Sequence, residues 1–456
     1  MKLTRRQVVA GAAAGAVGAT GIYELVDRLT GGSPKRAAAG RLYEEQHLLD
    51  GVRIVDQDGV AILVPPLHHE LLTARVVADR ADLRDARAEL ERALVGLERE
   101  YAPSPAGLGV TVAWGRPYFE RLVPAAWKRH RPHDRRAGKA ALVDSLRFPS
   151  DPPDTVLEAN EVAILLRSDS RDHIDDAVGR LRGTKTLELT SMRRGFAGGG
   201  FDGGRSLPKK MALAAGIPGA DLIPDGAELF LGFTSTQRAG MGPGAIANFE
   251  TLGYVDLRGG YFRQGTHMHV SHVKEDVEAW YLNFDFRERV DTAFRPNLKV
   301  REGAQTVPQG PEDVSAEADV HRDFRASGRI GHSASIQTTS RLQQDTVAPD
   351  GTVYEKGTAI PIRADFNTLD NPFAWSVRED EVGAQPAAGV HFVVFNPSSD
   401  DFHRNRLAMD GVFPGGKIHF PPRARGQGFN AVLSTTHRQN FLVPPRRRRS
   451  FPLAEL

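Results

Sequence analysis

The stretch VAILLRSDSRDHIDDAVGRLRGTKTLELT, residues 162–190, contains the pattern that decides the fold. Its first five residues are all apolar and predict a buried strand. Residues 173–181 place apolar side chains at helical spacing and predict an amphipathic helix, and residues 187–190 predict a second strand. Strand, helix and strand in this order are typical of the second half of a β-α-β-β-α-β module.

The residues before this stretch supply the first half of the same module. We predict a strand at 60–64 (VAILV), a long helix at 71–100 with apolar residues at helical spacing, and a strand at 109–114 (GVTVAW). Together with residues 162–190, these elements give the β-α-β-β-α-β order of the ferredoxin-like pattern.

The second half of the chain repeats this order less regularly. Predicted strands lie at 228–233, 268–273, 360–363 and 390–395, and predicted helices at 275–290 and 399–409. Residues 297–327 contain few apolar side chains and predict a long surface excursion. We therefore expect an α+β fold of two ferredoxin-like modules with antiparallel sheets packed together.

These patterns predict the domain boundaries. Residues 1–40 are expected to be a signal segment outside the fold, 41–195 an N-terminal module, 196–445 a C-terminal module and 446–456 a flexible basic tail.

Composition excludes several classes of protein. The 59 basic and 57 acidic side chains nearly cancel, which argues against a nucleic-acid partner, because such binding needs an excess of Lys and Arg. The chain has no cysteine, so disulfides, thiolate metal sites and iron–sulfur clusters are excluded.

The N-terminus carries a targeting pattern. Arg5 and Arg6 precede a weakly apolar run of Ala, Gly and Val, residues 8–22, which is shorter than the roughly 20 residues of a membrane-spanning helix. A paired arginine before such a run indicates export by the twin-arginine machinery, to the cell envelope or the outside. A short N-terminal membrane anchor is the alternative, because the small-residue cleavage site at 37–39 lies far beyond the apolar run.

A glycine-rich loop presents one carboxylate. In Gly199-Gly200-Phe201-Asp202-Gly203 the glycines allow backbone to approach a flat ligand, and the carboxylate can accept a proton. This G-x-x-D-G pattern resembles the signature of the dye-decolourising peroxidases, which belong to the dimeric α/β-barrel-like superfamily. Segments 162–182, 223–233 and 389–402 resemble flanking segments of that family in the right order. The resemblance spans roughly residues 42–415.

The resemblance implies a site for haem b. Asp202 would be the proton acceptor for hydrogen peroxide, and Arg363 would stabilise the negative charge that develops on oxygen. Gly199, Gly203 and Asp365 would lie against the cofactor; Asp365 stands where the family often has glycine.

His332 matches the family's axial iron ligand, because it is the one imidazole in the corresponding segment, residues 330–341. The sequence after it departs from the family's pattern. Asp323 or Asp370 would hold its second ring nitrogen, and the sequence does not choose between them. A metal site at the pair His267 and His269 is the competing hypothesis: the two share one face of a predicted strand, His272 points to the other face, and no third ligand is evident.

The expected function is a haem peroxidase that reduces hydrogen peroxide and oxidises small organic donors such as dyes or phenols. The alternative is a secreted ferredoxin-like protein that binds or transfers haem with little turnover, or that has lost haem. The oligomeric state stays open, with a homo-oligomer among the alternatives.

Overall fold

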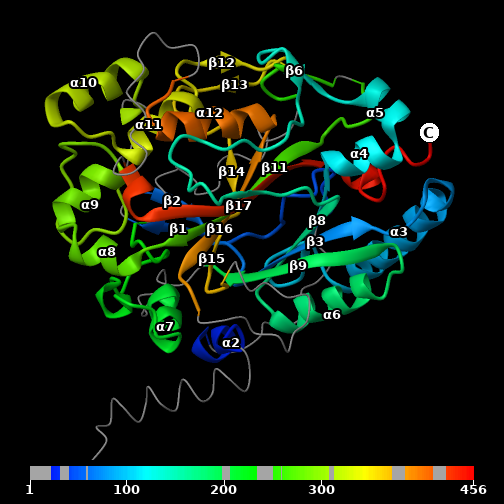
Figure 1. Cartoon of the computed structure of the whole chain (residues 1–456), viewed down its shortest axis with the longest axis horizontal. Helices are drawn as coiled ribbons and strands as arrows, with labels where there is room; N and C mark the ends of the chain where they lie inside the picture. Colours follow the sequence, from blue (N-terminus) through cyan, green and yellow to red (C-terminus); the bar gives the residue numbers. More distant parts are fainter. Residues whose placement is uncertain are drawn as a thin grey trace, which may run out of the picture.

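The computed structural model describes residues 22–30, 41–57, 60–197, 206–233, 250–257, 259–307, 313–371, 386–413 and 428–456. Within these residues the chain forms a mixed α+β fold around one large antiparallel sheet (Figure 1). No helix in the described part of the chain is long and apolar enough to cross a membrane.

Four strands and two helices make the N-terminal half. In chain order they are β3 (His68–Val76), α3 (Leu83–Glu100), β4 (Gly109–Gly115), β8 (Val162–Ser168), α6 (Arg171–Arg182) and β9 (Leu187–Phe196). The strands lie in the order β9-β3-β8-β4, all antiparallel. Helices α3 and α6 cover one face of these strands, and their apolar sides enclose a core with Leu90, Leu94 and Ile164 (Figure 1).

The C-terminal half has the same strand order. Its main elements are β11 (Thr266–Glu275), α8 (Val277–Leu282), α9 (Phe286–Ala293), α10 (Glu317–Ser327), α11 (His332–Ser340), β14 (Ile362–Arg363), β15 (Phe366–Thr368), β16 (Gly389–Asn396), α12 (Ser399–Met409) and β17 (Leu433–Val443). The strands lie in the order β15-β16-β11-β17, and β14 also pairs with β16.

The two halves close into a barrel. Strand β15 pairs with β9 through Asn367 and Phe196, and β17 pairs with β4 through Leu442 and Trp114. Side chains from both halves fill the interior, among them Leu71, Leu165, Val270, Val393 and Phe395. Because this interior is packed with side chains, an additional ligand has to bind outside the barrel.

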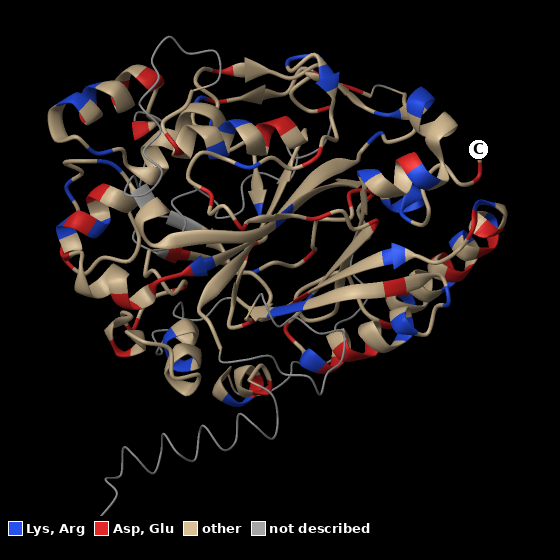
Figure 2. Ribbon diagram, viewed as in Figure 1, with Lys and Arg blue, Asp and Glu red and all other residues tan. Residues whose placement is uncertain are grey.

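Smaller elements surround the barrel. These are α2 (Glu24–Thr30), β1 (Ile54–Gln57), β2 (Val60–Leu63), α4 (Arg116–Leu122), α5 (Pro124–His130), β5 (His133–Asp134), β6 (Lys139–Ala140), β7 (Val156–Leu157), α7 (Leu207–Ala214), β10 (Val255–Asp256), β12 (Thr346–Val347) and β13 (Val353–Tyr354). The outer helices α3, α6, α9 and α10 carry side chains of both charge signs (Figure 2).

The predicted helix at 71–100 is wrong in its first third. Residues His68–Val76 form β3, which lies between β8 and β9, and the helix begins at Leu83. Eight of the nine side chains of β3 are buried, because the strand is hydrogen-bonded to β8 on one edge and to β9 on the other. This tertiary environment overrides the helical spacing of the apolar residues. The predicted strand at 60–64 becomes β2, which pairs with β1 in a separate hairpin instead of joining the module.

Three predictions in the second half need correction. Residues 228–233 form turns instead of a strand, and the single helix expected at 275–290 is two helices, α8 and α9. The excursion expected at 297–327 ends in helix α10. The side chain of Asp285 accepts a hydrogen bond from the backbone N–H of Glu288 and caps the start of α9. This cap explains why the helix expected at 275–290 is interrupted between α8 and α9.

The basic tail is a fixed part of the fold, contrary to the prediction of a flexible end. Arg449 is 1% exposed and forms ion pairs with Glu91 and Glu98 of α3. Phe451 is fully buried and packs against Trp114 and Tyr118. The last residues of the chain therefore complete the core of the N-terminal half.

Part of the expected signal segment also packs on the fold. Tyr23 is buried; its hydroxyl donates to Asp370 Oδ1 at 2.8 Å and accepts from the backbone N–H of Leu369 at 3.0 Å. Asp27 on α2 lies 2.7 Å from Nε2 of His68. In Figure 1 helix α2 lies beside α7 at the edge of the molecule. The predicted boundary at residue 40 thus excludes a helix that contributes to the core.

Candidate functional site

A cavity of about 260 Å³ lies between the outer face of the C-terminal strands and the helices that cover them. At about 30 Å³ for each water, it has room for on the order of ten water molecules. We call the strand side the sheet wall and the helix side the helix wall. The sheet wall consists of Ser271, Val273, Glu275, Pro361, Arg363, Asp365, Val390, Phe392, Val394, Leu433, Thr435 and Arg438. The helix wall includes Ala293, Phe294, His332, Ser333, Ile336, Gln337, Ser340, Phe402, Asn405, Arg406 and Met409.

The alternation of side chains along a strand determines the sheet wall. On β11, Ser271, Val273 and Glu275 face the cavity, whereas Met268 and Val270 point into the barrel. Strand β16 follows the same rule. One sheet therefore separates the packed barrel interior from the cavity.

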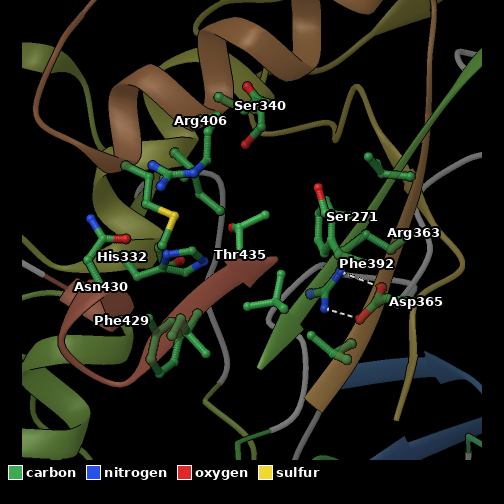
Figure 3. Close-up of a pocket in the computed structure, with 18 of the residues that line it drawn as sticks. Ser271, His332, Ser340, Arg363, Asp365, Phe392, Arg406, Phe429, Asn430 and Thr435 are labelled. Atoms are coloured by element: carbon green, nitrogen blue, oxygen red, sulfur yellow. Dashed lines mark hydrogen bonds and ion pairs between the residues drawn. The ribbon is translucent and has the colours of Figure 1, made fainter. Parts of the chain in front are cut away.

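His332 is the first residue of α11 and points into the cavity from the helix wall (Figure 3). Gly331 before it lies so close to Phe294 that a Cβ atom would come within 2.2 Å of the Phe294 carbonyl oxygen. Only glycine permits this approach, which fixes where the helix begins.

The imidazole of His332 is neutral at physiological pH. Burial, together with the positive charges of Arg363 and Arg406, lowers the pKa of His332 to about 3. Its Nδ1 is buried and has no hydrogen-bond partner in the part of the chain that the structure describes. A neutral, buried imidazole that lines a cavity is the form that can ligate a metal.

Arg363 and Asp365 lie on the opposite wall and bind each other. Arg363 Nε donates to Asp365 Oδ1 at 2.9 Å, and its Nη2 donates to Oδ2 at 2.6 Å (Figure 3). Burial works to lower the pKa of Arg363, but the charge and hydrogen bonds of Asp365 outweigh burial and raise it. The guanidinium is therefore charged at every working pH, and a carboxylate already neutralises part of that charge.

Glu275 is a candidate functional residue that the sequence analysis did not identify. It is 9% exposed and lines the cavity, and its Oε2 has no hydrogen-bond partner among the described residues. Burial, together with the negative charge of Asp365, raises the pKa of Glu275 to about 8. The strand period, which puts Glu275 on the same face as Ser271 and Val273, was the one available signal, and it does not reveal the cavity.

The cavity brings together three of the predicted site residues, His332, Arg363 and Asp365. Asp202, Gly199 and Gly203 lie outside the described residues. Both carboxylates suggested as partners of His332 bind elsewhere. Asp323 pairs with Arg295, and Asp370 accepts hydrogen bonds from Tyr23 and from the backbone N–H of Arg194.

The competing metal site is not formed in the described residues, which contain no cluster of three His, Cys, Asp or Glu side chains able to hold a metal ion. His267 lies 2.9 Å from the carbonyl oxygen of Pro397. His269 contacts the side chains of Asn440 and Ser271, each at 2.6 Å, and stacks on Phe402. These two imidazoles therefore have structural partners, and His269 fixes the hydroxyl of Ser271 at the cavity wall.

The structure of this chain matches 104 solved chains. DyPB from Rhodococcus jostii RHA1 is 13% identical, with 85% of this chain and 96% of that chain covered and a TM-score of 0.50. A DyP-type peroxidase from Cellulomonas bogoriensis is 17% identical, with 89% and 96% covered and a TM-score of 0.51. A variant of the Rhodococcus protein in complex with heme is 13% identical, with 85% and 95% covered and a TM-score of 0.50. At these identities the likeness establishes a DyP-type peroxidase fold.

No curated protein matches the chain in sequence. The model of one protein family matches residues 66–445, which include every described residue of the cavity walls. The chain therefore belongs to the family of unknown function DUF7405.

Proposed function

We propose that the protein is a haem peroxidase of the DyP type, built from two ferredoxin-like modules, that reduces hydrogen peroxide and oxidises small organic donors. One observation carries the proposal: a single cavity has a neutral imidazole, His332, on one wall and a permanently charged guanidinium, Arg363, on the other. The similar folds of the DyP-type peroxidases support it.

The residues of the cavity fit haem b. A flat apolar group needs apolar walls, and the cavity supplies Phe294, Ile336, Val390 and Phe392. His332 would bind the haem iron, since its imidazole is neutral and its Nδ1 has no hydrogen bond to any described residue. When bound, haem would supply the redox chemistry that couples peroxide reduction to oxidation of the donor.

The protein would contribute position and charge. Arg363 would hold peroxide against the sheet wall and stabilise negative charge on oxygen as the O–O bond breaks. Its bidentate ion pair with Asp365 fixes the orientation of the guanidinium. The apolar lining would limit the access of bulk water to the reacting oxygens.

The test is titration of the purified protein with haemin, followed by peroxide consumption. We expect a Soret band that saturates at one haemin per chain, and peroxide reduction much faster than that by free haemin. A chain that does not bind haemin would contradict the proposal.

The second candidate function is haem binding or transfer without turnover. The ion pair between Arg363 and Asp365 favours it, because a neutralised guanidinium stabilises an oxyanion less than a free one. Stoichiometric binding of haemin combined with peroxide consumption no faster than that by free haemin would support this candidate over the peroxidase.

We also propose that the chain is exported by the twin-arginine route and keeps helix α2 after export. The pair Arg5 and Arg6 supports the route. Retention is supported by the burial of Tyr23 and its hydrogen bonds to Leu369 and Asp370, because cleavage at 37–39 would remove these contacts.

Replacing both Arg5 and Arg6 by Lys should leave the folded protein in the cytoplasm, as measured by cell fractionation. The intact mass of the exported wild-type chain should include Tyr23. Export that continues in the variant would contradict the route, and an exported chain that begins near residue 40 would contradict retention of α2.

A further inference from the structure

Glu275 stands apart from the other buried carboxylates of the cavity. Asp365 is paired with Arg363, and Asp151 accepts a hydrogen bond from Arg438. Glu275 is nine-tenths buried, and one of its carboxylate oxygens has no hydrogen-bond partner among the residues that the structure describes. Leaving a buried polar group unsatisfied destabilises the fold, and an apolar residue at this position would avoid that cost.

The position of Glu275 is fixed by the backbone around it. Glu275 is the last residue of β11, and its N–H donates to the carbonyl oxygen of Ala388 at 2.9 Å. Its side chain follows those of Ser271 and Val273 along the face that lines the cavity. The carboxyl group therefore belongs to the same wall as Arg363 and Asp365.

The groups that surround Glu275 keep it protonated. Asp365, which lies between β14 and β15 on the same wall, brings a negative charge close to it, and the phenol of Tyr281 on α8 is uncharged. Four arginines line the cavity, and each has a partner. Arg363, Arg406 and Arg438 form ion pairs with Asp365, Asp410 and Asp151, and Arg341 donates to the carbonyl oxygen of Gly357. The nearby cations therefore do not offset the cost of ionising Glu275.

We propose that Glu275 is a general acid of this cavity, which donates a proton to an oxygen of peroxide held against the sheet wall; the proposal rests on the proposed function. When the O–O bond of hydrogen peroxide breaks, one oxygen leaves as water and needs one additional proton. Glu275 donates that proton, and the proton lost by the other peroxide oxygen restores the carboxyl group. Over the whole reaction the organic donor supplies two electrons and two protons, so that both peroxide oxygens end as water; haem, when bound, would relay the electrons.

The first test reads the proton directly and needs no haem. In the infrared spectrum of the purified chain, the carbonyl stretch of a protonated carboxylic acid should persist at pH 7 and disappear as the pH rises through about 8. The band should be missing in Glu275→Gln and unchanged in Glu278→Gln, a matched control three residues along the chain whose side chain is exposed.

The second test uses the haemin-loaded protein. Glu275→Gln should slow peroxide consumption about 10²-fold below pH 8, the lower end of the usual range for acid–base catalysis, and leave haemin affinity unchanged. The wild-type rate of peroxide consumption should fall above pH 8, where the carboxyl group of Glu275 ionises. The rate of the variant should not show this decrease.

The outcomes separate this proposal from the proposed function. If the wild-type band is missing, Glu275 carries no proton at pH 7 and the inference fails whether or not haem binds. A band that is present together with an unchanged pH profile in Glu275→Gln also overturns it. Failure of the wild-type chain to bind haemin is a different result and contradicts the proposed function itself.

Discussion

Replacing His332 by alanine should abolish the Soret band of the haemin-loaded protein. The imidazole is the one histidine side chain among the described residues that lines the cavity, and burial keeps it in the neutral form that binds iron. Losing a hydrogen-bond partner of a metal ligand typically costs 10–100-fold in affinity. Losing the ligand itself should therefore weaken haemin binding by more than about 10²-fold, measured by absorption titration.

His321→Ala is the matched control. His321 lies on the neighbouring helix α10 and is absent from the cavity walls, so this variant should bind haemin as the wild type does. Circular dichroism should show that both variants are folded. If folded His332→Ala binds haemin with an unchanged spectrum, the iron ligand lies elsewhere in the chain.

Arg363→Leu should slow peroxide consumption about 10²–10³-fold while haemin stays bound. This is the usual loss when one group that stabilises an oxyanion is removed. Because the pKa of Arg363 is raised above its already high normal value, the guanidinium is charged throughout the working range. The loss should therefore be the same from pH 5 to pH 9, in contrast to the pH-dependent effect expected for Glu275.

The ion pair requires two further variants, because Arg363→Leu leaves the carboxylate of Asp365 buried without its partner. Arg363→Leu combined with Asp365→Asn removes both charges, and we expect it to remain slow. Arg363→Lys keeps the charge but loses the bidentate geometry, so we expect a partial loss. A double variant as fast as the wild type would show that the buried, unpaired carboxylate of Asp365 slows the Arg363→Leu variant, and not the loss of the guanidinium.

The sequence predicts those helices and strands whose apolar residues follow a single clear period, either that of a helix or that of a strand. The buried strand at 162–166, the helix at 173–181 and the helix at 399–409 are all confirmed, since their apolar spacing agrees with their environment. Strand β3 was missed because its residues are buried on both faces, which removes the alternation that identifies a strand. The closure of the barrel through Asn367 and Phe196 joins residues far apart in sequence and leaves no local signal.

The site is predictable to a similar extent. His332 and Arg363 were identified from a resemblance, and the structure places them in one cavity. Their roles stay predictions. Glu275 was missed because its importance depends on burial and on the nearby charge of Asp365, and both arise only when β11 and β14 pair with the same strand. The partners suggested for His332 were wrong because Asp323 and Asp370 bind other groups in the folded chain.

The packing of the C-terminal segment on the N-terminal half has a consequence for biosynthesis. Domains usually fold as units while the ribosome is still translating, N-terminal first. Here Arg449 and Phe451 supply ion pairs and an aromatic side chain to the core beside α3 and β4. The N-terminal half therefore cannot reach its final packing until the segment that contains Arg449 and Phe451 has left the exit tunnel, so its native core forms only after the C-terminal half has been synthesised.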